Sequence, residues 1–210
     1  MTIDLAGKSV LVTGASIGIG RETALSFAAV GCNVALTWRE HRVEAEEAAQ
    51  RCLDLGAPDA FATRLQLGDE AGVSHVVDEV VERFGGLDIL VNNAGVISWE
   101  PFLDQDLEEI EEQILVNLLG VMRLTWYALP RLTGAVITVG STATLHQSRT
   151  PPPYCASKWG LRGFVKALSL EHPDRRIVSV HPTVTATRMN PGRGMAAGAR
   201  RRRHPQGGRR

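Results

Sequence analysis

Short runs of apolar and β-branched residues recur along the first 180 positions and alternate with stretches in which apolar residues follow helical spacing. The apolar runs predict buried strands at 8–13, 33–38, 60–67, 87–91, 135–139 and 176–180. The helical spacing predicts helices at 18–30, 41–55, 69–84, 107–129 and 154–170. Strands that alternate with helices in this way indicate βαβ units. The pattern therefore predicts an α/β fold with a doubly wound parallel sheet, covered on both faces.

The apolar pattern stops after Met189. From there to residue 210 Val, Ile, Leu, Phe, Trp, Tyr and Cys are absent, while Gly, Ala, Pro and Arg dominate. Such a segment has little apolar surface to offset the entropy lost on ordering, and nothing in it predicts a strand. We expect one domain at 1–187, followed by an atypical Arg/Gly-rich tail at 188–210 that is disordered.

Charge separates the same two parts of the chain. The formal net charge is zero, but residues 188–210 hold eight Arg and no Asp or Glu, so residues 1–187 carry a net charge of −8. Four consecutive Arg could bind nucleic acid or another polyanion. The tail lacks the aromatic residues that stack on single strands, so we expect a solvated tail and no nucleic-acid partner.

Other features of the sequence argue against a membrane protein, a disulfide-bonded protein and a metal site. No stretch of 18 apolar residues and no secretory leader pattern occurs, so we expect no membrane association. The three cysteines form no CxxC pair, which is typical of reduced cytoplasmic thiols. The six histidines show no HExxH or similar spacing, so we expect no metal site.

A glycine-rich loop, Thr13-Gly-Ala-Ser-Ile-Gly-Ile-Gly20, joins the first predicted strand to the first helix. A helix that begins in such a loop turns N–H groups and the positive end of its dipole outward. Glycines there let a pyrophosphate approach the backbone without meeting a Cβ. The loop predicts nucleotide binding, and the lack of a GKS or GKT sequence excludes a Walker-type phosphate loop.

Three further features follow predicted strands. Asn92–Gly95 follows the fourth strand, Ser141 closes the fifth, and Tyr154 and Lys158 share one face of the next helix. Ligands bind at the C-terminal ends of strands in open α/β sheets. Each feature alone is most simply a turn, a cap or an exposed helical face. The three features in this order favour a ligand-binding site.

Together these motifs resemble the classical short-chain dehydrogenase/reductase family. They are TGxxxGxG at Thr13–Gly20, NNAG at Asn92–Gly95, Asn117, Ser141, and YxxxK at Tyr154–Lys158, in the family's order over most of 6–189. The resemblance implies a Rossmann-like fold and hydride transfer between a nicotinamide cofactor and a carbonyl or alcohol. Members of the family usually add a final strand at the sheet edge, but the pattern of this chain predicts six strands and nothing like a strand at its end, so we expect that edge strand to be missing.

The resemblance assigns catalytic roles to Asn117, Ser141, Tyr154 and Lys158. A tyrosine pKa of about 10 is too high for efficient proton transfer near neutrality, and we expect the Lys158 ammonium to lower it for Tyr154. Ser141 can donate a hydrogen bond to the reacting oxygen. By resemblance, Lys158 also holds the nicotinamide ribose, and Asn117 positions a water that relays protons.

The family pattern also predicts where the cofactor lies. The expected cofactor-binding residues are Gly14, Ser16, Ile17, Gly18, Ile19, Gly20, Arg39, Gln66, Asn93, Ala94, Gly95, Tyr154, Lys158, Pro182, Thr183, Val184 and Thr187. Gln66 stands where the family commonly has an Asp, and Thr183 stands where it has a Gly.

The end of the second strand indicates which nicotinamide cofactor is used. No carboxylate occurs at Leu36–Arg39 to bind the ribose 2′-hydroxyl of NAD(H), and the Arg39 guanidinium suits a 2′-phosphate. Glu40 adjoins Arg39 and could weaken that attraction. We therefore expect NADP(H) to be favoured over NAD(H).

The partners follow from the same resemblance. We expect a small-molecule carbonyl or alcohol substrate and a homodimer formed through the helices at 107–129 and 154–170. The alternative is a binding or regulatory protein with little turnover, because the family's C-terminal substrate elements are absent. We expect packing or surface roles for Cys155, His146 and His181.

Overall fold

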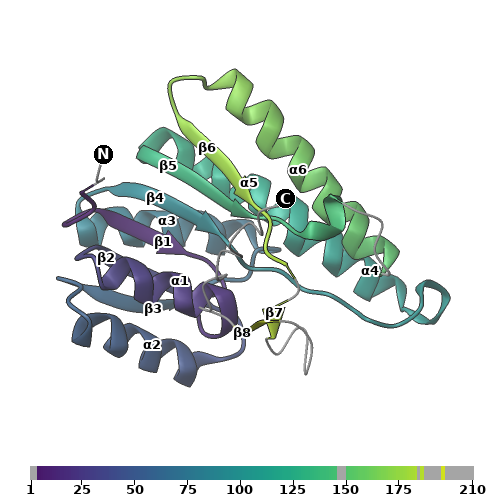
Figure 1. Ribbon diagram of the computed structural model, residues 1–210, viewed down its shortest axis with the longest axis horizontal. Helices are drawn as coiled ribbons and strands as arrows, with labels where there is room; N and C mark the ends of the chain where they lie inside the picture. Colours follow the sequence, from purple (N-terminus) through teal and green to yellow (C-terminus); the bar gives the residue numbers. More distant parts are fainter. Residues whose placement is uncertain (1–3, 146–149, 184, 187–194, 197–210) are drawn as a thin grey trace, which may run out of the picture.

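The computed structural model describes residues 4–145, 150–183, 185–186 and 195–196 (Figure 1). The main strands are β1 (Ser9–Val12), β2 (Asn33–Trp38), β3 (Ala60–Arg64), β4 (Leu87–Asn92), β5 (Leu132–Val139) and β6 (Arg176–Val180). They form a six-stranded parallel sheet in the order β3-β2-β1-β4-β5-β6. This arrangement confirms the predicted doubly wound α/β fold.

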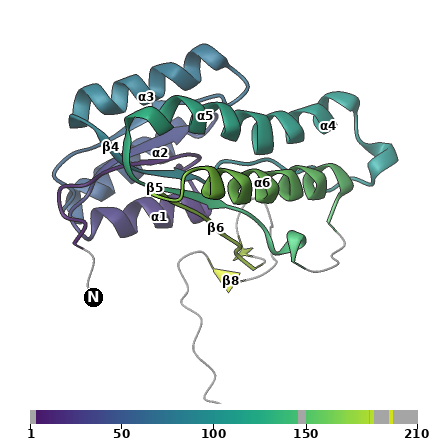
Figure 2. The ribbon, with the colours of Figure 1, turned by 90° about the horizontal axis from the view of Figure 1, so that it is seen from above.

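Helices cover both faces of this sheet. They are α1 (Gly18–Ala28), α2 (Arg42–Asp54), α3 (Glu70–Phe84), α4 (Leu107–Ile114), α5 (Gly120–Ala128) and α6 (Pro152–Glu171). Figure 2 shows α3 and α5 on one side of the sheet and α1 on the other. In the described ranges, none of the helices combines the length and the apolar character that a membrane crossing requires.

The central strand β1 feeds two separate cores because successive side chains point to opposite faces of a strand. Leu11 packs in a core with side chains of α3, α5 and α6. Val10 and Val12 pack in a second core with side chains of α1 and α2. All three are fully buried. The continuous apolar run that predicted this strand therefore reflects burial on both sides.

The helix predicted over 107–129 is interrupted. A π-helical turn, η2 (Leu115–Leu119), separates α4 from α5, and the Gly120 amide donates to the Leu115 carbonyl five residues earlier. Apolar residues keep helical spacing through this turn, so the pattern gave no sign of it. Single π turns inside helices often occur at functional sites, and Asn117 lies buried within this one.

Several boundaries differ from the predictions. Strand β3 ends at Arg64 rather than at residue 67, and β5 begins at Leu132 rather than at residue 135. Helix α6 begins at Pro152, because proline fits the first turn of a helix.

The part of the chain after β6 is described only in part. Strand β7 (Thr185–Ala186) pairs in parallel with β8 (Met195–Ala196), although the sequence pattern predicted no strand after residue 189. The run of Arg at 200–203 lies outside the described residues.

The strand order places a crevice at one edge of the sheet. The chain runs outward from β1 to β2 and β3, and then crosses back to β4 on the other side of β1. Consequently the connections that follow β1 and β4 leave the sheet in opposite directions. The glycine loop and the Asn92–Gly95 segment follow these two strands, so both lie at this switch point.

Candidate active site

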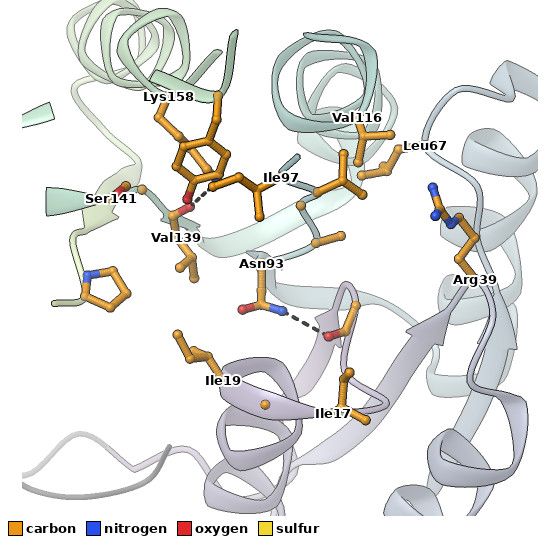
Figure 3. A pocket seen from close by; sticks show the side chains of 18 of the residues that line it. Ile17, Ile19, Arg39, Leu67, Asn93, Ile97, Val116, Val139, Ser141 and Lys158 are labelled. Atoms are coloured by element: carbon orange, nitrogen blue, oxygen red, sulfur yellow. Dashed lines mark hydrogen bonds between the residues drawn. The ribbon is translucent and has the colours of Figure 1, made fainter. Parts of the chain in front are cut away.

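A cavity of about 590 Å³ opens at this edge of the sheet (Figure 3). Most residues that the sequence predicted for the site line it: Gly14, Ser16, Ile17, Gly18, Ile19, Arg39, Asn93, Ala94, Gly95, Ser141, Tyr154, Lys158, Pro182 and Thr183. Val184 and Thr187 were also predicted, but they lie outside the described residues.

Three predicted residues are not in the cavity wall. Gln66 is exposed, and its neighbours Leu65 and Leu67 line the cavity instead. Asn117 is fully buried behind the wall. Gly20 is buried under the glycine loop, where an added Cβ would lie 2.4 Å from the Asn93 Nδ2 atom.

The Asn92–Gly95 segment fixes the shape of the glycine loop. The Asn93 Nδ2 atom donates to the carbonyls of Thr13 at 2.8 Å and Gly14 at 3.1 Å. In turn, the Thr13 hydroxyl oxygen accepts from the amides of Asn93 at 2.9 Å and Ala94 at 3.0 Å. Gly14 has a φ of +60°, and a Cβ there would lie 2.9 Å from the Ala94 Cα. Figure 3 shows Asn93 facing this loop.

The N-terminus of α1 suits an anionic group. Its N-cap residue, Ile17, has no side chain that can satisfy the first-turn amides, and the first turn contains no acidic residue. Gly18, Ile17 and Ile19 line the cavity at this point. Free amides and the positive end of the helix dipole therefore face the cavity, which fits the pyrophosphate of a dinucleotide.

Asn117 connects three parts of the site. Its Oδ1 atom accepts from the Val96 amide at 2.8 Å, and its Nδ2 atom donates to the Val96 carbonyl at 2.8 Å. The same Nδ2 atom donates to the Ser157 hydroxyl of α6 at 3.1 Å. The amide thus joins η2, the loop after β4, and the helix that carries Tyr154 and Lys158.

Lys158 is a buried ammonium group that lines the cavity. Its side chain is only 4% exposed, and burial lowers its pKa from 10.5 to about 8. The Nζ atom donates to the Val139 carbonyl at 3.2 Å. An ammonium group can donate three hydrogen bonds, so Lys158 has donors left for a polar ligand such as a ribose.

The expectation that Lys158 lowers the pKa of Tyr154 is wrong for this structure. Burial raises the pKa of Tyr154, and a hydrogen bond with the Ser141 side chain opposes that rise only in part. The Lys158 Nζ atom lies 5.7 Å from the centre of the Tyr154 ring and donates to a backbone carbonyl.

His181 holds the loop that carries Ser141, a role the sequence analysis did not consider beyond packing. Its Nδ1 atom lies 3.1 Å from the Ser141 carbonyl, and its Nε2 atom lies 2.9 Å from the Ser179 hydroxyl. A carbonyl can only accept, so Nδ1 is the donor to Ser141; in the neutral imidazole, Nε2 then accepts from the Ser179 hydroxyl. The signal in the sequence was only its position directly after β6.

Arg39 is paired with two carboxylates. Its guanidinium contacts Glu40, with the Nε atom 3.0 Å from Oε1, and it also forms an ion pair with Glu112 of α4. The sequence analysis considered Glu40 and missed Glu112, because 73 positions separate it from Arg39. Both carboxylates line the cavity.

No group of three or more His, Cys, Asp or Glu side chains in the described ranges is arranged to hold a metal ion. The cavity presents the phenol of Tyr154, the hydroxyl of Ser141 and the ammonium of Lys158, together with the Arg39 guanidinium.

Comparison with known proteins agrees with this geometry. The model of the short chain dehydrogenase family matches residues 8–196. An 11-beta-hydroxysteroid dehydrogenase A from Sesamum indicum is 34% identical over 202 residues, which cover 94% of this chain and 58% of the relative. A 3-oxoacyl-[acyl-carrier-protein] reductase FabG from Staphylococcus aureus is 35% identical, over 81% of this chain and 70% of the relative.

Solved structures give the same result. A short chain dehydrogenase from Burkholderia cenocepacia J2315 in complex with NADP is 34% identical, with a TM-score of 0.86 over 91% of this chain and 80% of that chain. The chain spans less than two thirds of the length of the first curated relatives, at 58% and 56%. With its family match, its six-stranded sheet and its residues at the strand ends, this chain belongs to the short-chain dehydrogenase/reductase family.

Proposed function

We propose that this protein is an oxidoreductase that transfers a hydride between NADP(H) and a small-molecule carbonyl or alcohol. The observation that carries the proposal is that Ser141, Tyr154 and Lys158 line the same cavity as the glycine loop and the N-terminus of α1. One end of the cavity thus offers proton-transfer groups, and the other offers sites for phosphate groups.

In this proposal Tyr154 is the acid in reduction and the base in oxidation. A reduced nicotinamide bound in the cavity would supply the hydride for the carbonyl carbon. Tyr154 gives its phenolic proton to the carbonyl oxygen, which completes the alcohol. Ser141 donates a hydrogen bond to that oxygen as negative charge develops on it. A tyrosine phenol is protonated at neutral pH, which is the form that reduction requires. Burial raises the pKa of Tyr154 and so makes it a weaker acid in the nucleotide-free protein.

Lys158 and Asn117 have supporting roles. Lys158 donates from its buried ammonium to the hydroxyls of the nicotinamide ribose, which places the ring beside Tyr154. Asn117 holds the loop at Val96 and supports a water-mediated proton relay to Lys158. Its three hydrogen bonds fix the relative positions of the two helices that build this end of the site.

NADP(H) is the proposed cofactor because Arg39 lies at the cavity and no carboxylate closes β2. A guanidinium pairs with a phosphate in a bidentate way. The solved relative from Burkholderia cenocepacia was crystallised with NADP, which supports the same choice.

The test is a titration of the protein with NADPH, followed by assays with a panel of carbonyl compounds. The panel includes a steroid ketone and a 3-oxoacyl thioester, because relatives are named for these substrates. Loss of NADPH absorbance that depends on protein and carbonyl supports the proposal. Binding without turnover on any carbonyl would favour the alternative of a binding or regulatory protein, which the names of the relatives do not favour.

A homodimer through the helices at 107–129 and 154–170 belongs to the same proposal. Trp126 of α5 is 71% exposed and Trp159 of α6 is 52% exposed, and large apolar surface of this kind is typical of interfaces. Sedimentation of Trp126→Arg should show loss of the dimer. Leu103→Arg is the control, because Leu103 is 91% exposed but lies outside both helices.

We also propose a cytoplasmic location. Cys32, Cys52 and Cys155 are all free thiols, and Cys32 and Cys52 are buried. Free thiols fit a reducing compartment. Fractionation of cells with an antibody to the protein tests this proposal.

A further inference from the structure

The Arg39 side chain is held from two directions. Glu40 follows it in sequence and accepts from its Nε and Nη2 atoms. Glu112 lies on α4 and accepts from Nη1, so this ion pair joins the end of β2 to a helix on the other side of the cavity. With one guanidinium and two carboxylates, the cluster has a formal charge of −1.

This cluster lies far from the proposed reaction centre. Figure 3 shows Arg39 near Leu67 and Val116, at the opposite end of the cavity from Ser141 and Lys158. If the nicotinamide lies beside Lys158, the adenosine half of the cofactor lies at the Arg39 end. A ribose 2′-phosphate there would meet a cation that is already paired.

We propose that Glu112 is a specificity-determining residue that competes with the ribose 2′-phosphate for Arg39. The inference rests on the proposed NADP(H) function and adds a role for a residue outside the cofactor motifs. The Glu112 carboxylate takes one of the five N–H donors of the Arg39 guanidinium and neutralises part of its charge. A phosphate that binds Arg39 must either displace this carboxylate or stay close to its negative charge. The neutral 2′-hydroxyl of NAD(H) meets no such repulsion. Glu112 therefore lowers the affinity for NADPH more than the affinity for NADH.

Glu112 is better placed for this role than Glu40. The Glu112 side chain is 45% exposed and the Glu40 side chain 63%, so solvent screens the charge of Glu112 less. Glu40 also adjoins Arg39 in the chain and can stay with it when a phosphate binds. The Glu112 ion pair instead joins Arg39 to α4, across the cavity that the phosphate would enter.

The experiment measures the dissociation constants of NADPH and NADH for the full chain by calorimetry. The variants are Glu112→Gln, which removes the charge and keeps the shape, and Glu111→Gln. Glu111 is exposed on the same helix and is not among the cavity-lining residues, so its variant controls for net charge. Glu112→Ala is a second form of the test in case the glutamine replaces the carboxylate as a hydrogen-bond acceptor.

We expect Glu112→Gln to tighten NADPH binding by about three- to tenfold, the order expected for one charge near a phosphate. NADH binding should change by less than about twofold, and the gain for NADPH should shrink at high salt. Glu111→Gln should change neither constant. The fragments 2′,5′-ADP and 5′-AMP should repeat the difference without the nicotinamide.

Unchanged or weaker NADPH binding in both Glu112 variants overturns the inference, because Glu112 would then orient Arg39 rather than compete for it. Equal tightening of NADPH and NADH also overturns it. Failure of the proposed function gives a different result: the wild-type protein binds neither nucleotide, and the inference fails with it.

Discussion

The side-chain amide of Asn117 pairs with both backbone polar groups of Val96, at 2.8 Å to the amide nitrogen and 2.8 Å to the carbonyl oxygen. Asn117 therefore completes the backbone hydrogen bonding of a loop residue, as a neighbouring strand would. Its position in the π turn η2 aims the amide at that loop. An interruption in a helix thus helps to fix one wall of the candidate active site.

Replacing the fully buried Asn117 with Ala should lower the free energy of unfolding by about 2–4 kcal/mol, because it removes three hydrogen bonds and leaves the partly buried polar groups of Val96 without their partners. Chemical denaturation measures this loss. Asn33→Ala is the control, since the Asn33 side chain makes one long, exposed hydrogen bond to Gly7, and its loss should cost less than about 1 kcal/mol. Equal losses in the two variants would show that the Asn117 contacts do not carry the effect.

Lys158 should make the stability of the nucleotide-free protein depend on pH. Its pKa is about 8 in the fold and 10.5 in the unfolded chain, so the unfolded chain binds more protons between these values. The cost of burying the ammonium is fully present below pH 8. It is relieved as the pH rises from about 8 toward 10.5. The wild-type protein should therefore gain stability over this interval relative to Lys158→Met, by up to about 3 kcal/mol.

Urea denaturation of both proteins from pH 7 to pH 9.5 measures the difference, of which about 2 kcal/mol falls within this range. This range stays below the ordinary pKa of Tyr154, whose titration would otherwise contribute. A constant difference between wild type and variant across the range would show that Lys158 keeps an ordinary pKa.

His181 should act on turnover through Ser141. Replacing it with Phe keeps a ring of similar size but removes the hydrogen bonds to the Ser141 carbonyl and the Ser179 hydroxyl. Because a misplaced group is costly in catalysis, kcat should fall about tenfold or more, while the NADPH dissociation constant changes little. His181→Gln can still donate to the Ser141 carbonyl and should restore part of the rate. Equal rates for Phe and wild type would contradict a positioning role.

Arg39→Ala should weaken NADPH binding about tenfold and leave NADH binding within about twofold, because only NADPH carries the 2′-phosphate. Arg42→Ala is the matched control. It removes the same charge from α2, where Arg42 pairs with Glu46 away from the cavity lining. Equal weakening of both cofactors by Arg39→Ala would remove Arg39 from phosphate recognition.

Much of the fold was predictable because the apolar pattern along the chain agrees with the burial of each strand in the folded sheet. Val10, Leu11 and Val12 form a continuous apolar run because both faces of β1 are buried. The glycine loop was predictable because its positive-φ position at Gly14 and its close contacts demand particular residues. The strand ends then brought Ser141 and the YxxxK motif to one edge of the sheet.

The parts that were not predictable depend on contacts between distant positions. The Arg39 to Glu112 ion pair joins residues 73 positions apart, and no local pattern marks it. Gln66 was predicted to bind the cofactor by analogy with the family. In the structure Gln66 is exposed to solvent, and Leu67 lines the cavity instead. The shift of the Tyr154 pKa depends on how deeply the phenol is buried, which spacing along a helix does not give.

Replacing Tyr154 with Phe tests the central claim most directly, since it removes only the hydroxyl that is proposed to transfer the proton. The measurement is the rate of carbonyl reduction, followed by NADPH absorbance, together with the NADPH dissociation constant. We predict that the rate falls by about 10²–10⁴-fold and that NADPH binding stays within about threefold of wild type. Turnover at the wild-type rate in Tyr154→Phe would contradict the proposed function.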